Sequence, residues 1–561
     1  MFHQHRNRLR LLCLILALCL VLPLAGCKDD KTPVQTESGL PEDSTPVESF
    51  SEEDITDEPE DTKEYVETTV PPPVTVDDLG GFAVSTSTSE ATQVGMQILS
   101  SGGNAVDAAV AISFLLSVSE PYSSGIGGGG IMVIYDSKTG VAKTLNYYPC
   151  AGSAAANTDK VGVPGMVAGM EKAVKKWGSM PLADLIQPAV DYAEQGFVVS
   201  DTFIDWLHYD DSLQNNPAFR GLREGDTLKQ MELAKTFRAI QEQGADVFYR
   251  GYIAQDIDAA CSLTAEDLAA YKARTYQVVE STFSGWNIYG AYAPSSALTV
   301  CQMLKVAEML NIPSPEEDPE GYLAALKTAT TVAYRSRTSR VVDPKFYSFK
   351  PRKALSSEYL QGKIDTLNSS AWVDDPEKIC TTQFSVIDSS GLVVCVTNSL
   401  QRSWGSYRCV DGFYLNYTLD NFSNSGKNAY EPGKQPRTGF SPMICVGPEG
   451  QILAIGTPGG NEIPKLLTTV LIDILREGTD VQTAVDKSRI VFQTNGILQY
   501  EYEDVNPLVV DISSYDAKGV IFEHKIFGCT SIVGYDPVTG VYAISDKRRE
   551  TSTAMAYQFN S

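Results

Sequence analysis

Two adjacent threonines, Thr381 and Thr382, are the residues of this chain whose setting best suits chemistry. Residues 380–387 alternate polar and apolar side chains, a pattern that predicts a strand with one buried face. Residues 388–391 predict a turn, and residues 393–396 predict a second strand that returns beside the first. Two hydroxyls at the start of a strand ordinarily have only a structural role. A catalytic role therefore has to be supported by other parts of the sequence.

Two glycine-rich segments favour a catalytic role for Thr381 and Thr382. Residues 456–460 read Gly-Thr-Pro-Gly-Gly, a tight turn whose backbone N–H groups can face a developing oxyanion. Residues 120–130 read Glu-Pro-Tyr-Ser-Ser-Gly-Ile-Gly-Gly-Gly-Gly. This second segment matches the spacing of a dinucleotide-binding motif, but that motif follows a strand, whereas here the expected strand, residues 131–135, comes after the glycines. A nucleotide site is therefore rejected.

These three segments, in this order, resemble the γ-glutamyltransferase family of N-terminal-nucleophile hydrolases. Other landmarks of that family also occur in order: GGNAVDAA at 102–109, GVPG at 162–165, APSS at 293–296 and FSP at 440–442. The resemblance extends from residue 80 to the C-terminus. It implies an α/β (α+β) fold, the four-layer αββα sandwich of this class, built by a precursor that cuts itself into a large and a small subunit.

The resemblance also implies the catalytic residues. The chain would be cut between Cys380 and Thr381, which makes Thr381 the N-terminal nucleophile. A threonine hydroxyl is a weak nucleophile, but a new α-amine with a pKa of about 8 can act as its base. The family's second hydroxyl, which orients this amine, falls at Ser399. The two N–H groups of the oxyanion hole fall at Gly459 and Gly460, where glycine lets the backbone approach the substrate closely.

The pocket for the γ-glutamyl group departs from the family's pattern. The carboxylate-binding arginine falls at Tyr148, whose neutral hydroxyl cannot form the bidentate pair that a guanidinium forms. The acid that contacts the substrate amine falls at Asn421 or at the neighbouring Asp420. The remaining pocket positions fall at Gln401, Thr418, Thr438 and Gly439.

Because these charged residues are missing, several substrates are compatible with the sequence. Three arginines can replace the missing cation or can be plain surface charges: Arg402, Arg408 and Arg437. Each lost charge-assisted hydrogen bond is worth about 1.5–3 kcal/mol, enough to change the preferred substrate. The main expectation is hydrolysis or transfer of γ-glutamyl amides such as glutathione-like peptides. The alternatives are an acylase for another acyl group, a hydrolase of poly-γ-glutamate, and a binding lipoprotein that cleaves nothing.

The N-terminus predicts export and lipid anchoring. Basic residues precede an apolar run, residues 11–24, that is too short to span a membrane, so residues 1–26 are expected to be a signal peptide. The run ends in Leu-Ala-Gly-Cys, which resembles a lipobox with lipid attached to Cys27, although an incidental cysteine is the alternative. The protein is thus expected at the outer face of a bacterial cell membrane.

Composition and residue patterns along the rest of the chain predict its domains. Residues 27–79 are acidic and poor in aliphatic residues, which predicts a disordered tether. The large subunit is expected at 80–380, mostly helical, and the small subunit at 381–561, where short strands alternate with helices. Helices are expected at 89–99, 104–118, 181–196, 297–310 and 329–340, and a further one follows Thr264.

Charge and residue counts exclude some classes of partner. A net charge of −25 argues against nucleic acid as a partner. Only four histidines occur, and two of them lie in the signal peptide, which disfavours a multi-histidine metal site. No metal and no cofactor is implied. Cys395 and Cys409 are expected to pack in the core near the site.

Overall fold

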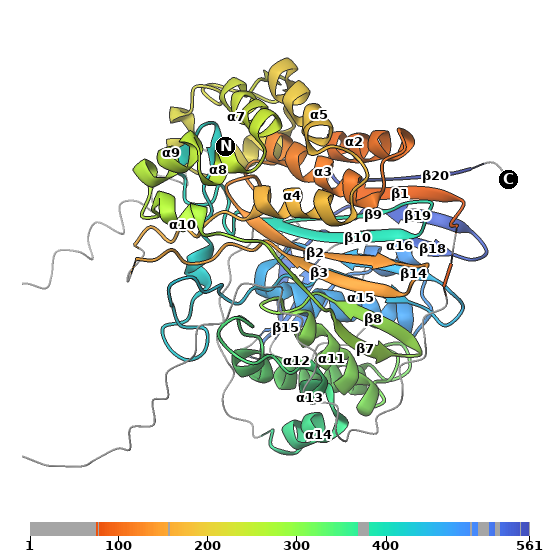
Figure 1. Cartoon of the computed structure of the whole chain (residues 1–561). Helices are drawn as coiled ribbons and strands as arrows, with labels where there is room; N and C mark the ends of the chain where they lie inside the picture. Colours follow the sequence, from red (N-terminus) through yellow and green to blue (C-terminus); the bar gives the residue numbers. More distant parts are fainter. Residues whose placement is uncertain are drawn as a thin grey trace, which may run out of the picture. The chain divides into compact units, whose positions relative to one another are not determined.

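Two antiparallel β-sheets lie face to face at the centre of the structure, a computed structural model (Figure 1). In the first sheet the strand order is β20 (Thr553–Gln558), β1 (Gly81–Thr86), β9 (Thr382–Ile387), β10 (Leu392–Ser399), β2 (Gly129–Asp136), β3 (Val141–Asn146) and β6 (Arg274–Tyr276). In the second sheet it is β19 (Gly540–Ile544), β18 (Ser531–Asp536), β14 (Ile452–Gly456), β13 (Met443–Val446), β8 (Trp286–Gly290) and β7 (Val279–Phe283).

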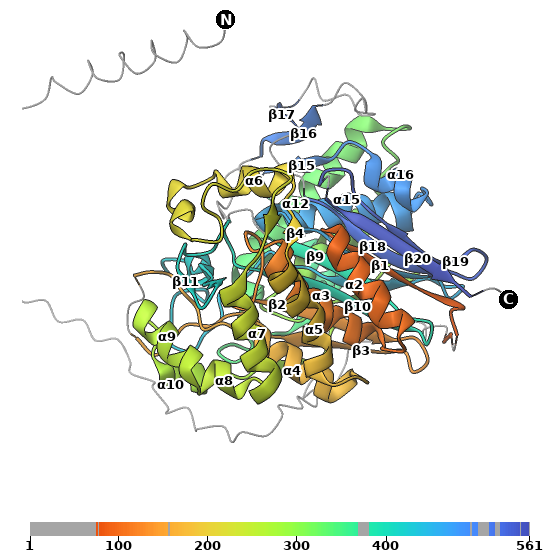
Figure 2. The same cartoon turned by 90° about the horizontal axis from the view of Figure 1, so that it is seen from above.

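Helices cover the outer face of each sheet, as Figures 1 and 2 show. The first sheet carries α2 (Ser89–Ser100), α3 (Ala105–Ser119), α4 (Met166–Trp177), α5 (Leu182–Gln195) and α7 (Met231–Gln243). The second sheet carries α11 (Ala297–Met309), α12 (Pro319–Arg340) and α15 (Ile463–Leu475). The layers are therefore helix, sheet, sheet and helix, which confirms the expected αββα architecture.

Shorter elements complete the chain. The short helices are α6 (Asp201–Leu207), α8 (Asp246–Tyr249), α9 (Tyr252–Ala260), α10 (Ala265–Ala269), α13 (Pro351–Leu355), α14 (Ser357–Asp365) and α16 (Val481–Asp486). The short strands are β4 (Phe197–Val198), β5 (Thr227–Leu228), β11 (Cys409–Val410), β12 (Phe413–Tyr414), β15 (Ile490–Phe492), β16 (Leu498–Tyr502) and β17 (Ala517–Ile521). Single 3₁₀ turns are η1 (Asp211–Asn215), η2 (Thr418–Asn421) and η3 (Gly460–Glu462).

The structure describes residues 75–76, 78–154, 158–367, 381–493, 496–502, 515, 517–521, 528–549 and 551–559. The expected signal peptide, Cys27, nearly all of the expected acidic tether and Cys380 lie outside these residues. Within them, no helix is both long enough and apolar enough to cross a membrane.

Alternation along β10 explains how the sheets bury two separate cores. Val394 and Val396 pack against the helices of the first layer, whereas Val393 and Cys395 point toward the second sheet. The rings of Tyr135 on β2 and Tyr289 on β8 stack across the gap between the sheets, 5.4 Å apart. Because successive side chains of a strand point to opposite faces, one strand can serve both cores.

Several expected elements are confirmed. The hairpin of β9 and β10, and the helices α2, α3, α5 and α11, lie where the sequence predicts them. Asn104 caps α3 and Thr264 caps α10, each in a reciprocal capping box. The helix expected at 329–340 begins earlier, at Pro319, after the Asp318 cap.

One expectation is incomplete and one is wrong. The chain before residue 381 has more helix than strand, as expected, but it also supplies six strands of the two large sheets. Two of these strands, β1 and β2, are buried on both faces and therefore show little alternation between polar and apolar residues. Cys395 packs in the core, but Cys409 is exposed on the small hairpin of β11 and β12, where it lines a surface cavity of about 720 Å³.

Candidate active site

Strand register brings Thr381 and Ser399 together. In the antiparallel pair of β9 and β10, Asn398 lies opposite Thr382, so the next residue, Ser399, comes opposite Thr381. The Thr381 hydroxyl donates to the Ser399 hydroxyl at 3.5 Å, and the Thr381 residue is only 3% exposed. Ser399 Oγ also accepts from the backbone N–H of Gln401 at 2.7 Å, which fixes the serine side chain.

The run of glycines that follows Pro121 allows other backbone segments to pack closely against this end of β10. A Cβ at Gly128 would collide with the carbonyl oxygen of Ser399, and one at Gly130 would collide with Asn398. Gly128 also accepts backbone hydrogen bonds from Gly165 and Met166 at 2.8 and 3.2 Å. Glycine is therefore required here because three backbones meet beside β10.

Glu120, at the head of that run, is a buried carboxylate directly beside the candidate nucleophile. It accepts hydrogen bonds from the hydroxyls of Thr382 at 2.6 Å and Ser87 at 2.8 Å. It also forms an ion pair with Arg549 at 2.6 Å, and Arg549 donates to the carbonyl oxygen of Thr381 at 3.4 Å. Glu120 lies in the motif at residues 120–130, but no role was predicted for it from the sequence. The sequence around Arg549 did not indicate a role for that residue either.

The turn of residues 456–460, called the glycine turn below, lies near the same strand end. Strand β14 stops at Gly456, where a Cβ would collide with the side-chain amide of Gln383, two residues after Thr381. Gly459 has a φ of 141° and Gly460 a φ of 58°, values that glycine adopts without strain. The turn leads through η3 into α15.

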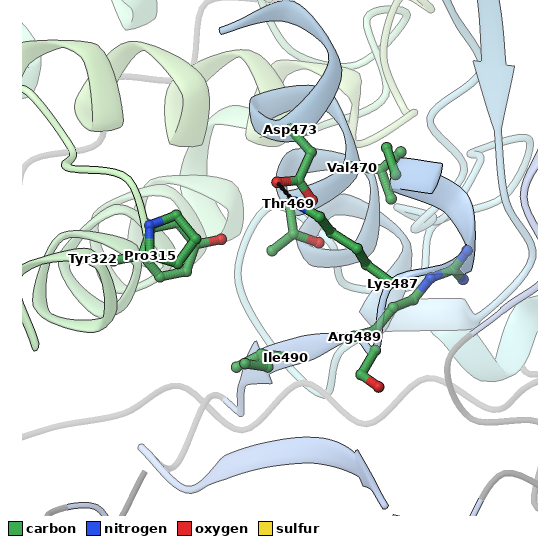
Figure 3. Close-up of a pocket in the computed structure, with 10 residues that line it drawn as sticks. Pro315, Tyr322, Thr469, Val470, Asp473, Lys487, Arg489 and Ile490 are labelled. Carbon is green, nitrogen blue, oxygen red and sulfur yellow. Dashed lines mark hydrogen bonds and ion pairs between the residues drawn. The ribbon is translucent and has the colours of Figure 1, made fainter. Parts of the chain in front are cut away.

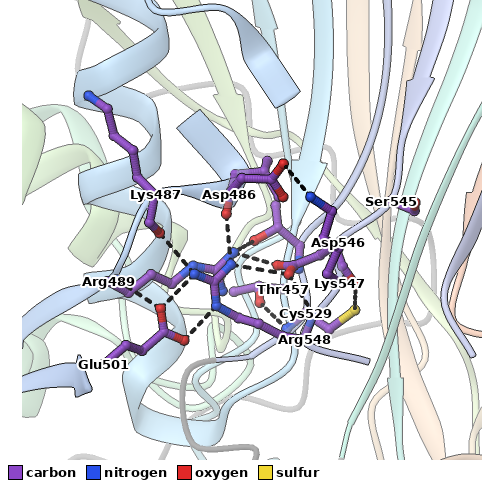
Figure 4. Close-up of polar contacts among 12 residues, drawn as sticks. Thr457, Asp486, Lys487, Arg489, Glu501, Cys529, Ser545, Asp546, Lys547 and Arg548 are labelled. Atoms are coloured by element: carbon purple, nitrogen blue, oxygen red, sulfur yellow. Dashed lines mark hydrogen bonds and ion pairs between the residues drawn. The ribbon is translucent and has the colours of Figure 1, made fainter. Parts of the chain in front are cut away.

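A buried charge network supports the far side of the glycine turn (Figure 4). The Thr457 hydroxyl accepts from the backbone N–H of Cys529 at 3.1 Å, and the Cys529 thiol contacts the carbonyl oxygen of Asp546 at 3.7 Å. Burial alone would raise the pKa of Asp546, but the guanidinium groups of Arg489 and Arg548 outweigh burial and lower it. The turn is thus tied to a buried cluster of ion-paired arginine and acidic side chains.

Three of the expected pocket residues form a closed ring of neutral hydrogen bonds. The Tyr148 hydroxyl donates to Gln401 Oε1 at 3.1 Å, Gln401 Nε2 donates to Asn421 Oδ1 at 3.1 Å, and Asn421 Nδ2 donates to the Tyr148 oxygen at 3.2 Å. The Tyr148 ring also packs edge-on against Phe440, with centroids 5.3 Å apart. These three positions therefore hold neutral polar groups where the family resemblance leads one to expect a cation and an acid.

Asp420 and Arg402 pair with each other instead of joining this ring. Their charged groups lie 2.9 Å apart, and the Arg402 guanidinium lies 3.8 Å from the centroid of the Tyr417 ring. Arg408 donates to the carbonyl oxygen of Ala260 at 2.8 Å.

Three further expected residues, Thr418, Arg437 and Thr438, are all buried. The Thr418 hydroxyl is buried without a hydrogen-bond partner among the described residues. Arg437 is buried, and its guanidinium donates to the carbonyl oxygen of Thr338 at 3.5 Å. The Thr438 carbonyl accepts from the Ser296 hydroxyl at 2.6 Å.

Comparison with known proteins identifies the family. A family model described as Gamma-glutamyltranspeptidase matches residues 91–556. The chain belongs to this family. It is similar to the capsule biosynthesis protein CapD proenzyme of Bacillus anthracis, with 36% identity over 429 residues, covering 74% of this chain and 80% of that protein. It is also similar to the glutathione hydrolase proenzyme of Bacillus subtilis (strain 168), with 30% identity over 485 residues, covering 76% and 82%.

A solved structure agrees with the assignment to the gamma-glutamyltranspeptidase family. The cephalosporin acylase from Bacillus halodurans superposes with a TM-score of 0.76 and 25% sequence identity, covering 88% of this chain and 99% of that one. The protein is therefore an enzyme of the gamma-glutamyltranspeptidase family with the N-terminal-nucleophile hydrolase fold, as the sequence predicts.

A small cavity lies outside the site of this gamma-glutamyltranspeptidase family member (Figure 3). It holds about 50 Å³ between α12, α15 and β15, and Tyr322, Asp473 and Lys487 are among its lining residues. Burial raises the pKa of Asp473, and the Lys487 ammonium group at 3.0 Å offsets part of that rise. None of the expected site residues lines it.

Proposed function

We propose that this enzyme cleaves γ-glutamyl amide bonds through a covalent intermediate on Thr381, after it has cut its own chain between Cys380 and Thr381. The observation that carries the proposal is the approach of the Thr381 hydroxyl to within 3.5 Å of Ser399 Oγ at a buried strand end. The glycine turn beside that strand end supplies backbone N–H groups for an oxyanion.

In the processing step, the Thr381 hydroxyl attacks the carbonyl carbon of Cys380. The peptide C–N bond breaks and an ester forms, and water hydrolyses the ester to leave a carboxylate on Cys380 and a free amine on Thr381. The contact of Arg549 with the Thr381 carbonyl, together with the bond from Thr382 to Glu120, would hold the strand end while this bond breaks. The proton of the Thr381 hydroxyl ends on the departing peptide nitrogen, which becomes the free amine of Thr381. That amine is the base in the later turnover, which suits a chain with few histidines.

In turnover, the Thr381 amine accepts the hydroxyl proton while Thr381 Oγ1 attacks the substrate carbonyl carbon. The N–H groups of Gly459 and Gly460 stabilise the oxyanion, and Ser399 orients the amine. The leaving amine takes the proton as the amide C–N bond breaks. Water, or an acceptor amine in transfer, then attacks the acyl ester and releases Thr381.

The neutral ring of Tyr148, Gln401 and Asn421 favours a second candidate, an acylase for acyl groups that lack the charged α-groups of glutamate. A carboxylate or an ammonium group gains most from a charged partner, and this ring offers only amides and a hydroxyl. The similarity to a cephalosporin acylase and to CapD is consistent with variation in the acyl group within this fold.

The lipobox ending in Cys27 supports a location at the outer face of a bacterial cell membrane, reached through a lipid on that cysteine. Phase partition of the expressed full chain tests this part. The wild type is expected in the detergent phase and a Cys27→Ser variant in the aqueous phase, and equal partition of the two would contradict lipidation.

The first experiment compares the purified chain from residue 28 onward with its Thr381→Ala variant on a denaturing gel. The wild type is expected as two fragments, the smaller beginning at Thr381, and the variant as one intact band. A Thr381→Ser variant keeps a hydroxyl and is expected to process. An intact wild-type band would contradict the proposal and favour a binding lipoprotein. Rates with γ-glutamyl and glutaryl p-nitroanilide then decide between the two acyl groups.

A further inference from the structure

Tyr334 connects the outer helix of the second sheet to the glycine turn. It lies on α12, is buried, and its hydroxyl donates a hydrogen bond to the carbonyl oxygen of Asn461. Asn461 directly follows Gly460 in η3. The two residues are 127 positions apart and lie on opposite sides of the proposed cleavage point, so this bond would join the two subunits of the processed enzyme.

Two cations hold the Tyr334 ring. The Lys465 ammonium lies 5.2 Å from the ring centroid and the Arg337 guanidinium lies 5.8 Å from it, distances typical of cation–π contacts. Lys465 also forms an ion pair with Glu462 at 2.7 Å, and Glu462 accepts a further hydrogen bond from Gln493 at 3.0 Å. The tyrosine is therefore fixed by the same lysine that anchors the end of η3.

The glycine turn needs such an anchor. Two successive glycines with positive φ give the backbone little intrinsic restraint, since glycine has many accessible conformations. The Asn461 side chain adds no restraint, because within the described residues neither its Nδ2 nor its Oδ1 has a hydrogen-bond partner, although the residue is only 6% exposed. The peptide after Gly460 is held through its backbone by Tyr334 and through Glu462 N–H, which donates to Gly459 at 3.1 Å.

We propose that Tyr334 is a positioning residue for the oxyanion hole: its hydroxyl fixes the peptide after Gly460, so that the Gly459 and Gly460 N–H groups stay directed at the reacting carbonyl. The proposal rests on the proposed function of the glycine turn. Tyr334 acts in this proposal through the Asn461 peptide and not on the reacting atoms. Its effect belongs to the transition state, because the oxyanion exists only there and a donor displaced by a fraction of an ångström stabilises it less.

A Tyr334→Phe variant isolates the hydroxyl, since it keeps the ring that Lys465 and Arg337 face. We expect kcat per processed chain to fall about 10- to 50-fold while KM changes less than about 3-fold, because substrate binding does not need the oxyanion donors. The inhibition constant of a boronic acid that forms a tetrahedral adduct on Thr381 is expected to rise in parallel, by about the same factor as kcat falls.

Tyr322→Phe is the matched control, because Tyr322 is a second buried tyrosine of α12 that lines the cavity of Figure 3 and not the glycine turn. It is expected to leave kcat and boronate affinity unchanged. If Tyr334→Phe does not fold, Lys465→Met removes the cation next to the same ring and is expected to lower kcat in the same direction.

The outcomes separate this inference from the proposed function. A wild type that neither processes nor hydrolyses amides overturns the proposed function, and the inference falls with it. An active wild type with a Tyr334→Phe variant that has lower thermal stability but unchanged kcat and boronate affinity overturns the inference alone. A loss in kcat matched by the boronate, absent from Tyr322→Phe, supports it.

Discussion

The carboxylate of Glu120 and the guanidinium of Arg549 meet 2.6 Å apart, beside the main chain of Thr381. Glu120 is fully buried at the head of the glycine run, and Arg549 lies between β19 and β20 near the C-terminus. The pair therefore ties both ends of the catalytic domain to the strand that carries the candidate nucleophile.

A Glu120→Gln variant should destabilise the protein and slow its processing. The amide keeps the shape of the side chain but leaves Arg549 largely buried without its counter-charge, a change that costs about 3 kcal/mol when a buried pair is broken. Thermal unfolding measures the stability, and the fraction of cut chain over time measures the processing. Lys235→Gln, in an exposed ion pair with Glu232, serves as control and should change stability by less than about 0.5 kcal/mol. Equal stability of the two variants would contradict a structural role for the pair.

Loss of the Ser399 hydroxyl should lower kcat strongly. Ser399→Ala removes the oxygen that Thr381 approaches and that accepts from Gln401, so the amine loses its orientation; we expect a fall of about 100-fold. Ser399→Thr keeps the hydroxyl and should retain most activity. Ser385→Ala, which changes a buried serine on the neighbouring strand β9, should leave kcat per folded chain within a few-fold of the wild type. Activity of Ser399→Ala equal to that of the wild type would exclude the assigned role.

The pair Asn421 and Asp420 offers a test of substrate choice. Asn421→Asp puts a carboxylate into the ring with Tyr148 and Gln401, where a substrate ammonium group can pair with it. The ratio of kcat/KM for γ-glutamyl over glutaryl p-nitroanilide should then rise about 10-fold. Asp420→Asn should leave that ratio unchanged, because Asp420 already pairs with Arg402. A collapse of γ-glutamyl activity in Asp420→Asn would instead assign the amine contact to Asp420.

Local signals explain what the sequence could predict. The family resemblance assigned Thr381 and Ser399, and the hairpin that alternation predicted explains why these residues, 18 positions apart, come opposite each other. The capping boxes at Asn104 and Thr264 lie within one helical turn. The neutral ring also followed from the sequence in part, because Tyr148 and Asn421 were aligned to pocket positions of the family.

Contacts between residues far apart in the chain explain what the sequence could not predict. Arg549 meets Glu120 across 429 positions, and Tyr334 meets Asn461 across 127, and no periodicity links such residues. Strand β1 was missed because burial on both faces removes the alternation that identifies a strand, whereas β2 was expected at residues 131–135. Cys409 was assigned to the core because it was expected in a strand near the site, yet the two-residue strands there form a hairpin on which Cys409 is exposed.

Asp411, between the two strands of that hairpin, should make stability depend on pH. Burial, followed by the neighbouring carboxylates of Asp256 and Glu232, raises the pKa of Asp411 to about 6. The folded state therefore holds a proton more tightly than the unfolded chain, in which an aspartate titrates near pH 4. The stabilisation from this group is complete below about pH 4 and is lost as the pH rises through about 6.

An Asp411→Asn variant should remove this dependence. Its melting temperature relative to the wild type should rise between pH 5 and pH 8, because only the wild type must ionise a carboxyl beside two others. Asn also tolerates the positive φ of 46° at this position, but that contribution is the same at every pH and cancels in the difference. Asp246→Asn, on an exposed carboxylate paired with Arg250, is the control and should show no such trend across this range. A constant difference between Asp411→Asn and the wild type at both pH values would show that Asp411 titrates normally in the folded protein.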